Sequence, residues 1–105
     1  MDYLKVRFDR ENVWLEGRAL RDTDCETVYA LKSMAGNIKE IHIDIEYMNC
    51  CFSRALYAFL SRMDNAEIYW HIKDPFYVHA DLPELYSEVS GRPIKLIDET
   101  TFAVA

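Results

Sequence analysis

Short segments in which every second residue is apolar recur along this chain, and segments of helical periodicity separate them. Residues 41–46 and 67–73 each place isoleucine or tryptophan at alternate positions, with charged residues, histidine or tyrosine between them. A strand of this pattern turns its apolar side chains to one face of a sheet and its polar side chains to the other. Sheets that helices cover on both faces have strands of continuous apolar residues instead. The alternation therefore predicts a sheet with all of its helices on one face and a bare polar face on the other.

Further strands are expected near both ends of the chain. Residues 3–8 and 13–16 alternate in the same way, and the polar residues 9–12 between them predict a hairpin turn. Residues 93–97 predict a short last strand. The side chains expected on the bare sheet face are those of Lys5, Arg7, Trp14, His42, Asp44, Tyr69 and His71.

Three segments carry helix signals. A capping box formed by Thr23 and Glu26 predicts a first helix that runs to Ala35. A third helix is expected between Asp81 and Gly91, with proline in its first turn. Its apolar stripe is Leu82, Leu85, Tyr86 and Val89. The second helix follows residue 49, and its apolar positions fit one helical face. Those positions are Phe52, Ala55, Leu56, Phe59, Leu60 and Met63.

The fold class that these segments predict is α/β. The 105 residues are enough for a single domain, residues 1–105, with the element order β-β-α-β-α-β-α-β and a mixed sheet of four or five strands. Right-handed crossovers that always step in the same direction would keep the helices on one face. The expected result is a curved β/α superhelix.

Charge and cysteine content narrow the class of function and the compartment. The formal charge of -6 disfavours binding to nucleic acid and to anionic membranes. Three cysteines, two of them adjacent, do not form a secreted disulfide framework, so reduced thiols in the cytoplasm are expected. The charged, alternating residues 1–10 have the character of neither a signal peptide nor an anchor.

The adjacent cysteines raise the possibility of thiol chemistry. Cys50, Cys51, Phe52 and Ser53 form a C-x-x-S motif at the expected start of the second helix. Thioredoxin-type enzymes use this position because the helix dipole and its free N–H groups stabilise a thiolate. Their motif follows an early strand and faces a cis-proline, whereas here it follows the third strand. A thiol oxidoreductase that uses Cys50 is therefore the alternative hypothesis, and packing residues at a helix start are the simpler interpretation.

Histidines and carboxylates on the bare face offer a second possible chemistry. His42 and His71 point to the same face, and Asp44 lies near them, but no metal-binding spacing accompanies these residues. Asp44 and Glu46 lie on an exposed strand, whereas acid–base catalysis needs a pocket that perturbs its groups. A solvated polar face accounts for these residues, so no metal and no cofactor is expected.

The segment after the third strand resembles a known family. Residues 46–54, E-Y-M-N-C-C-F-S-R, resemble the E-Y-F-N-T-S-S-S-K segment of bacterial regulatory phosphoproteins with a STAS-like fold, the fold of anti-sigma-factor antagonists. Residues 13–18 resemble the early I-x-G-R-S strand of that family, and residues 68–70 resemble its V-x-W-Y strand. Residues 81–85 and 94–97 resemble its final helix and short strand. The resemblance covers most of the chain.

The resemblance implies a phosphorylation switch on a non-enzymatic signalling module. In the family, a Ser/Thr kinase phosphorylates the threonine after the asparagine, and a PP2C-type phosphatase removes the phosphate. The unmodified form binds a partner, which in one branch is a diguanylate cyclase, and the wider fold binds anti-sigma kinases in the same way. For this chain the resemblance implies a protein partner of one of these types. A monomer or a weak homodimer, the latter joined through the bare sheet face, is expected.

The sequence departs from the family at the switch itself. The family threonine corresponds to Cys50, and the next two hydroxyl positions correspond to Cys51 and Phe52, so only Ser53 keeps a hydroxyl. Either the switch has moved to Ser53, or it is lost and the chain is permanently competent to bind. Asn49 is expected to cap the helix, with residues 50–53 as its exposed first turn. The residues expected to contact the partner are Tyr47, Asn49, Cys50, Cys51, Ser53 and Arg54.

Overall fold

A computed structural model shows how the chain folds, and it describes residues 3–31, 33, 37–63 and 65–99. None of the helices in these residues has the length and apolar character needed to cross a bilayer. The elements within them are β1 (Lys5–Asp9), β2 (Asn12–Ala19), α1 (Asp22–Leu31), β3 (Glu40–Met48), α2 (Cys50–Ser61), β4 (Glu67–Ile72), α3 (Leu82–Ser90) and β5 (Ile94–Asp98).

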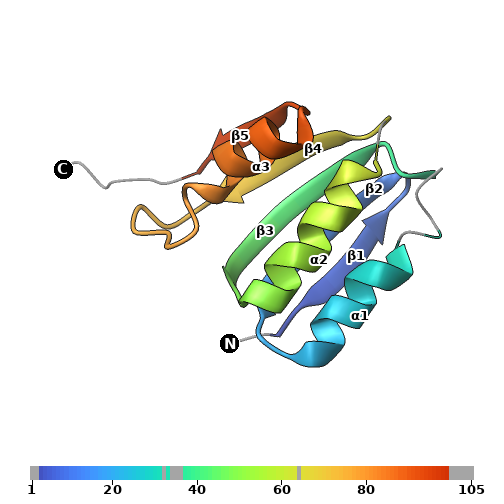
Figure 1. Cartoon of the computed structure of the whole chain (residues 1–105), viewed down its shortest axis with the longest axis horizontal. Coiled ribbons are helices and arrows are strands. Elements are labelled where there is room, and N and C mark those ends of the chain that lie inside the picture. The colour runs from blue at the N-terminus through green and yellow to red at the C-terminus, as the bar shows by residue number, and fades with distance from the viewer. Residues whose placement is uncertain (1–2, 32, 34–36, 64, 100–105) are drawn as a thin grey trace.

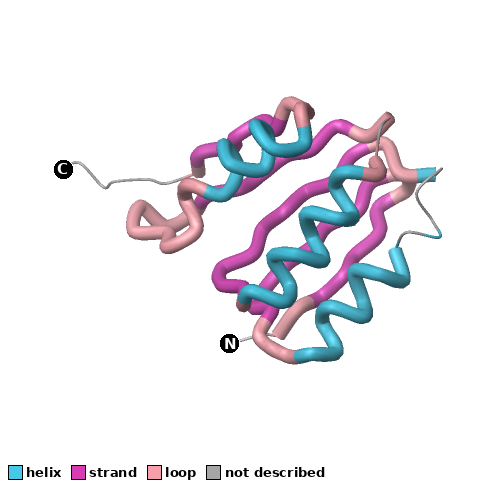
Figure 2. Tube along the Cα trace, in the orientation of Figure 1, coloured by secondary structure: helices cyan, strands magenta, loops and turns pink. Residues whose placement is uncertain are grey.

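The strands form one mixed sheet, and the helices lie on one of its faces. The strand order β1-β2-β3-β4-β5 follows the chain, with β1 antiparallel to β2 and every later pair parallel. All three helices lie on the same side of the sheet, as Figures 1 and 2 show. The prediction of an α/β fold with a mixed sheet of up to five strands is confirmed.

The core lies between the apolar face of the sheet and the inner faces of the helices. Every residue of the predicted apolar stripe of α2 is buried, from Phe52 to Met63. Phe59 is fully buried there, and Trp70 of β4 is fully buried on the apolar face of the sheet. The alternation in the strands is also kept, since Ile41, Ile43 and the other isoleucines of β3 point into the core.

β3 and β4 pair over only part of their length. Their paired residues run from Glu40 and Glu67 to Ile43 and Trp70, although β3 continues to Met48. Beyond the paired part the two strands diverge, as Figure 1 shows for the green and yellow strands. The sheet is therefore forked at the carboxyl ends of β3 and β4.

The helix ends differ in part from the sequence prediction. The prediction of a capping box at Thr23 is wrong, because α1 begins at Asp22. The Asp24 carboxylate instead accepts a 2.9 Å hydrogen bond from the Arg21 amide. The helix ends at Leu31, and the predicted end at Ala35 lies outside the described residues.

The predicted stripe of α3 is only partly buried. Of its residues, Tyr86 is buried, whereas Leu85 and Val89 remain 49% and 60% exposed. The reason is that α3 packs over β5 and reaches α2 only along one edge, so part of its apolar face has no helix beside it. The end of α3 is as predicted, since Gly91 has a φ of 71° and closes the helix in the left-handed conformation.

Two phenylalanines provide a test of this core. Phe59→Ala removes a fully buried ring and should lower the free energy of unfolding by about 3–5 kcal/mol, because it leaves a cavity. The same substitution at Phe76, which is 84% exposed, should change it by no more than about 0.5 kcal/mol. Urea denaturation followed by circular dichroism measures both changes. Equal effects for the two variants would contradict the core described above.

Candidate functional site

The start of α2 is built around Asn49. This residue is extended, with φ -84° and ψ 173°, and its side-chain oxygen accepts a 2.8 Å hydrogen bond from the Phe52 amide. Its side-chain nitrogen donates to the Leu20 carbonyl oxygen at 3.1 Å, and its backbone carbonyl accepts from the Ser53 amide at 3.0 Å. The predicted N-cap is confirmed, and the bond to Leu20 also joins the helix start to the end of β2.

The side chains around this cap are mostly exposed. Tyr47, Cys50, Cys51 and Arg54 all reach the surface, and Phe52 is fully buried beneath them. Tyr47 stacks obliquely on His79, with 5.1 Å between the ring centroids. The first turn of α2 is therefore an exposed surface that the cap and a buried phenylalanine hold in place.

Ser53 is not exposed in the way that the sequence predicted. Its side chain is half-buried, and its hydroxyl lies 2.5 Å from the phenol oxygen of Tyr86 on α3. The Tyr86 hydroxyl donates to the Ser53 backbone carbonyl at 2.8 Å, so the serine hydroxyl is the donor in the first bond. Burial raises the pKa of Tyr86 and keeps this phenol protonated. Phosphorylation of Ser53 would remove the hydroxyl proton that makes the first of these bonds.

An apolar groove lies beside the helix start, between α2 and α3. It encloses about 290 Å³ and is lined by Ser53, Arg54, Tyr57, Leu85, Tyr86 and Val89. The exposed part of the α3 stripe forms one wall. Sequence analysis missed the groove because helical periodicity does not tell which part of an apolar stripe a neighbouring element will cover.

The two adjacent cysteines have different surroundings. Cys50 is exposed at the first position of α2. The Sγ atom of Cys51 lies 2.7 Å from that of Cys25, a buried residue of α1. The C-x-x-S motif points to Cys50, whereas the structure places a second thiol beside Cys51.

The bare sheet face carries one row of stacked side chains that crosses every strand. The row is in register and consists of Arg7, Trp14, His42, Tyr69 and Lys95. The rings of Trp14 and His42 are parallel, with centroids 4.1 Å apart, and Tyr69 stacks on the other side of His42 at 4.9 Å. A cation lies over each end of the row. Because the ring faces contact one another, the row presents ring edges to solvent, and a flat ligand such as a base finds no stacking surface.

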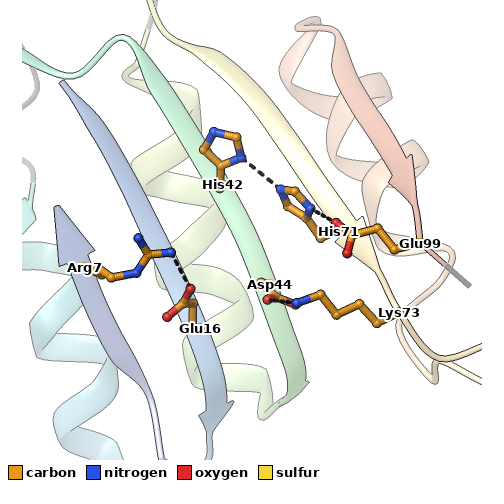
Figure 3. A network of polar contacts seen from close by, with 7 residues as sticks. All are labelled: Arg7, Glu16, His42, Asp44, His71, Lys73 and Glu99. Carbon is orange, nitrogen blue, oxygen red and sulfur yellow. Dashed lines mark hydrogen bonds and ion pairs between the residues drawn. The ribbon is translucent and has the colours of Figure 1, made fainter. Parts of the chain in front are cut away.

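Two histidines beside this row form a chain with two glutamates. Glu40 contacts His42 Nε2 at 2.9 Å, His42 Nδ1 contacts His71 Nε2 at 2.9 Å, and His71 Nδ1 contacts Glu99 at 2.6 Å. Figure 3 shows the last two contacts and, beside them, the Asp44–Lys73 ion pair at 2.8 Å. The prediction that the polar face is solvated is wrong for His71, which is only 7% exposed.

The two carboxylates set the direction of the outer hydrogen bonds of this chain. A carboxylate only accepts hydrogen bonds, so His42 Nε2 donates to Glu40 and His71 Nδ1 donates to Glu99. Trp14 and Tyr69 cover both faces of the His42 ring. The chain is thus a closed set of hydrogen bonds, and the described residues include no group of three or more His, Cys, Asp or Glu side chains placed to hold a metal.

A cleft of about 540 Å³ occupies the fork between β3 and β4. Arg18, Asp44 and Lys73 line it together with Phe76 and Tyr77 of the following loop. Its charges are largely compensated within the protein, since Lys73 pairs with Asp44 at 2.8 Å and Arg18 approaches Glu46 at 3.7 Å.

The loop between β4 and α3 lies at the far side of the fork. Its His79 binds a backbone amide of β3 in the part of β3 that no longer pairs with β4. The Met48 amide donates to His79 Nε2 at 3.2 Å, which requires an unprotonated nitrogen, and burial lowers the pKa of His79 accordingly. Sequence analysis missed the cleft, because the divergence of two strands depends on the loop that follows them.

No family model matches the chain, and a search of curated proteins finds no significant match. The resemblance of residues 46–54 and of the four shorter segments to a family therefore stays an expectation from the sequence.

The cap at Asn49 can be tested by its removal. Asn49→Ala should lower the free energy of unfolding by about 0.5–2 kcal/mol, because the Phe52 amide and the Leu20 carbonyl lose their partner. Asn65→Ala, at an exposed turn beyond the other end of α2, is the matched control and should have a much smaller effect. Chemical denaturation measures both. Equal losses would contradict the role of Asn49.

The contact between Glu99 and His71 predicts a pH dependence of stability. The hydrogen bond from His71 lowers the pKa of Glu99 from its ordinary value of 4.5, so the contact stabilises the fold above that pH. This contribution is lost as the pH falls through the lowered pKa. Glu99→Gln should therefore be less stable than the native protein near neutral pH, and the difference should shrink below pH 4.5.

Urea denaturation at a series of pH values measures this difference. Glu88→Gln, which removes an exposed carboxylate from α3, is the control. A difference between Glu99→Gln and the native protein that stays constant from pH 7 into the acid range would contradict the assigned role of the ion pair.

Proposed function

We propose that this chain is a non-enzymatic regulatory module of the STAS-like type that binds a protein partner through the start of α2. The proposal concerns the surface formed by Tyr47, Cys50, Cys51 and Arg54, together with the groove between α2 and α3. The observation that carries it is the combination of exposure and rigidity at this surface. Asn49 and the buried Phe52 hold the turn, so its backbone loses little freedom on binding.

The chemistry of the surface supports a partner with an apolar patch. Leu85 and Val89 expose apolar side chains along the groove, and Arg54 supplies a cation at its edge. Groups of this kind form the centre and the rim of protein interfaces. The resemblance adds the class of partner, which is a Ser/Thr kinase, a PP2C-type phosphatase, a diguanylate cyclase or an anti-sigma-type protein in the cytoplasm.

The switch of the related family is proposed to be absent from this chain. Cys50 stands at the position of the family phospho-acceptor and has no hydroxyl. The hydroxyl of Ser53 is bonded to Tyr86 and half-buried. The proposed form is therefore permanently competent to bind, unless another modification acts on the same surface.

The geometry gives less support to a thiol oxidoreductase that uses Cys50. The serine of the C-x-x-S motif is engaged with Tyr86 rather than with Cys50. The described peptide bonds, that of Pro75 included, are all trans, so the cis-proline that faces the motif in thioredoxin-type enzymes is not among them.

A charge at the proposed surface tests the function. Cys50→Asp places a carboxylate in the first turn of α2, where the helix dipole favours it by about 0.3–1 kcal/mol, so the fold should be unchanged or slightly more stable. The same charge should weaken a partner complex at least tenfold, because the contact would bury it. Asn65→Asp adds an equal charge beyond the other end of the helix and is the matched control.

The measurement is affinity purification from the native host with the native chain and both variants, followed by titration of the partner that is recovered. A specific partner that binds the native chain and Asn65→Asp but not Cys50→Asp supports the proposal. Equal binding by all three chains would overturn the proposed surface. Reduction of a disulfide substrate by the native chain, lost in Cys50→Ser, would overturn the non-enzymatic assignment.

A further inference from the structure

We infer that Cys25 and Cys51 are the two halves of a reversible disulfide that joins α1 to the first turn of α2. The two helices lie side by side on the sheet (Figure 1), and the two thiols meet across their contact. Their Sγ atoms are 2.7 Å apart, which is only about 0.7 Å more than the bonded distance of about 2.05 Å. The two sulfurs therefore need to approach by only that amount to form the bond.

The two thiols differ in the way that a disulfide exchange requires. Cys51 is exposed on the helix surface, where a small oxidant reaches it, and Cys25 is buried behind it. Burial, followed by the hydrogen bond to Cys51, raises the pKa of Cys25 to about 11, so this thiol stays protonated and donates to Cys51. Cys51 is therefore the first thiol to react, and Cys25 resolves the product.

The oxidant is a small disulfide, and the reaction balances in two steps. Deprotonated Cys51 attacks one sulfur of the small disulfide, forms a mixed disulfide and releases one small thiolate, which takes up a proton. Cys25 then loses its proton and attacks Cys51 Sγ, and the second small thiol leaves. The protein loses two electrons and two protons, and the small disulfide gains them. Once Cys51 is in the mixed disulfide, its charge and its hydrogen bond no longer raise the pKa of Cys25, which favours the second step.

The bond would act on the surface to which a partner is proposed to bind, and this consequence rests on the proposed function. Oxidation holds the Cys51 side chain against α1 and fixes the first turn of α2 to a second helix. Cys50, the neighbouring thiol, has no sulfur partner among the described residues and stays free. This chain would thus carry a thiol switch at the helix start where the family that it resembles carries a phosphorylation switch.

Titration of the purified full chain with mixtures of a reduced and an oxidised small thiol tests the inference without any partner. After an acid quench, alkylation of the chain unfolded in denaturant should show that free thiols fall from three to one. The intact mass before alkylation should fall by about 2 Da, and a reductant should reverse this loss. Peptide mapping should find residues 25 and 51 in one cross-linked species. Cys50→Ser should leave this result unchanged, and Cys51→Ser, a change at an exposed position, should abolish it.

Two results would overturn the inference. One is a free Cys25 thiol, fully alkylated once the acid-quenched chain is unfolded in denaturant, after equilibration of the folded native chain with the oxidised thiol. The other is a product that links Cys50 between two chains or carries only a mixed disulfide. These measurements need no partner, so they test the disulfide even if no partner is found. If the disulfide does not form, the proposed binding surface is not affected.

Discussion

The contact between α2 and the apolar face of the sheet is the interaction on which the rest of the structure depends. Full burial of each large apolar side chain contributes roughly 1.5–3 kcal/mol, and α2 buries its whole stripe from Phe52 to Leu60, with Met63 buried just beyond its end. Because α2 follows β3 directly, this burial also fixes where the first turn of the helix stands. Phe52 is both the first buried residue of the stripe and the donor to the Asn49 cap. The exposed surface of the turn is therefore held by the same residue that begins the core.

The polar face of the sheet is stabilised differently, by a row of side chains in register. A strand that exposes one face to water needs polar side chains, but it does not need them to touch. Here Trp14, His42 and Tyr69 stack across neighbouring strands, and the two histidines share protons with two glutamates. Cross-strand pairs of this kind stabilise a sheet. The row thus covers part of the bare sheet face with side chains that already contact one another.

The prediction from sequence was strongest where the pattern is local. Alternation located the strands, and one face of helical periodicity located α2 with every buried residue correct. Asn before a helical stripe identified the cap. The errors concern side chains whose burial depends on a residue that is distant in the sequence. The exposure of Leu85 and Val89 depends on how far α2 extends beside α3, the half-buried state of Ser53 depends on Tyr86, and the burial of His71 depends on Glu99 and on the stacked row.

The sequence by itself determined the element types, the one-sided covering of the sheet and the capped start of α2, because each follows from side-chain spacing within a few residues of the same segment. Only the tertiary structure decided which groups meet. It brought Cys25 to Cys51, separated by 26 positions, and Ser53 to Tyr86, separated by 33. It also opened the fork between β3 and β4. Such contacts depend on the crossover that places one helix beside another and on the length over which two strands pair, and no local pattern encodes either of these.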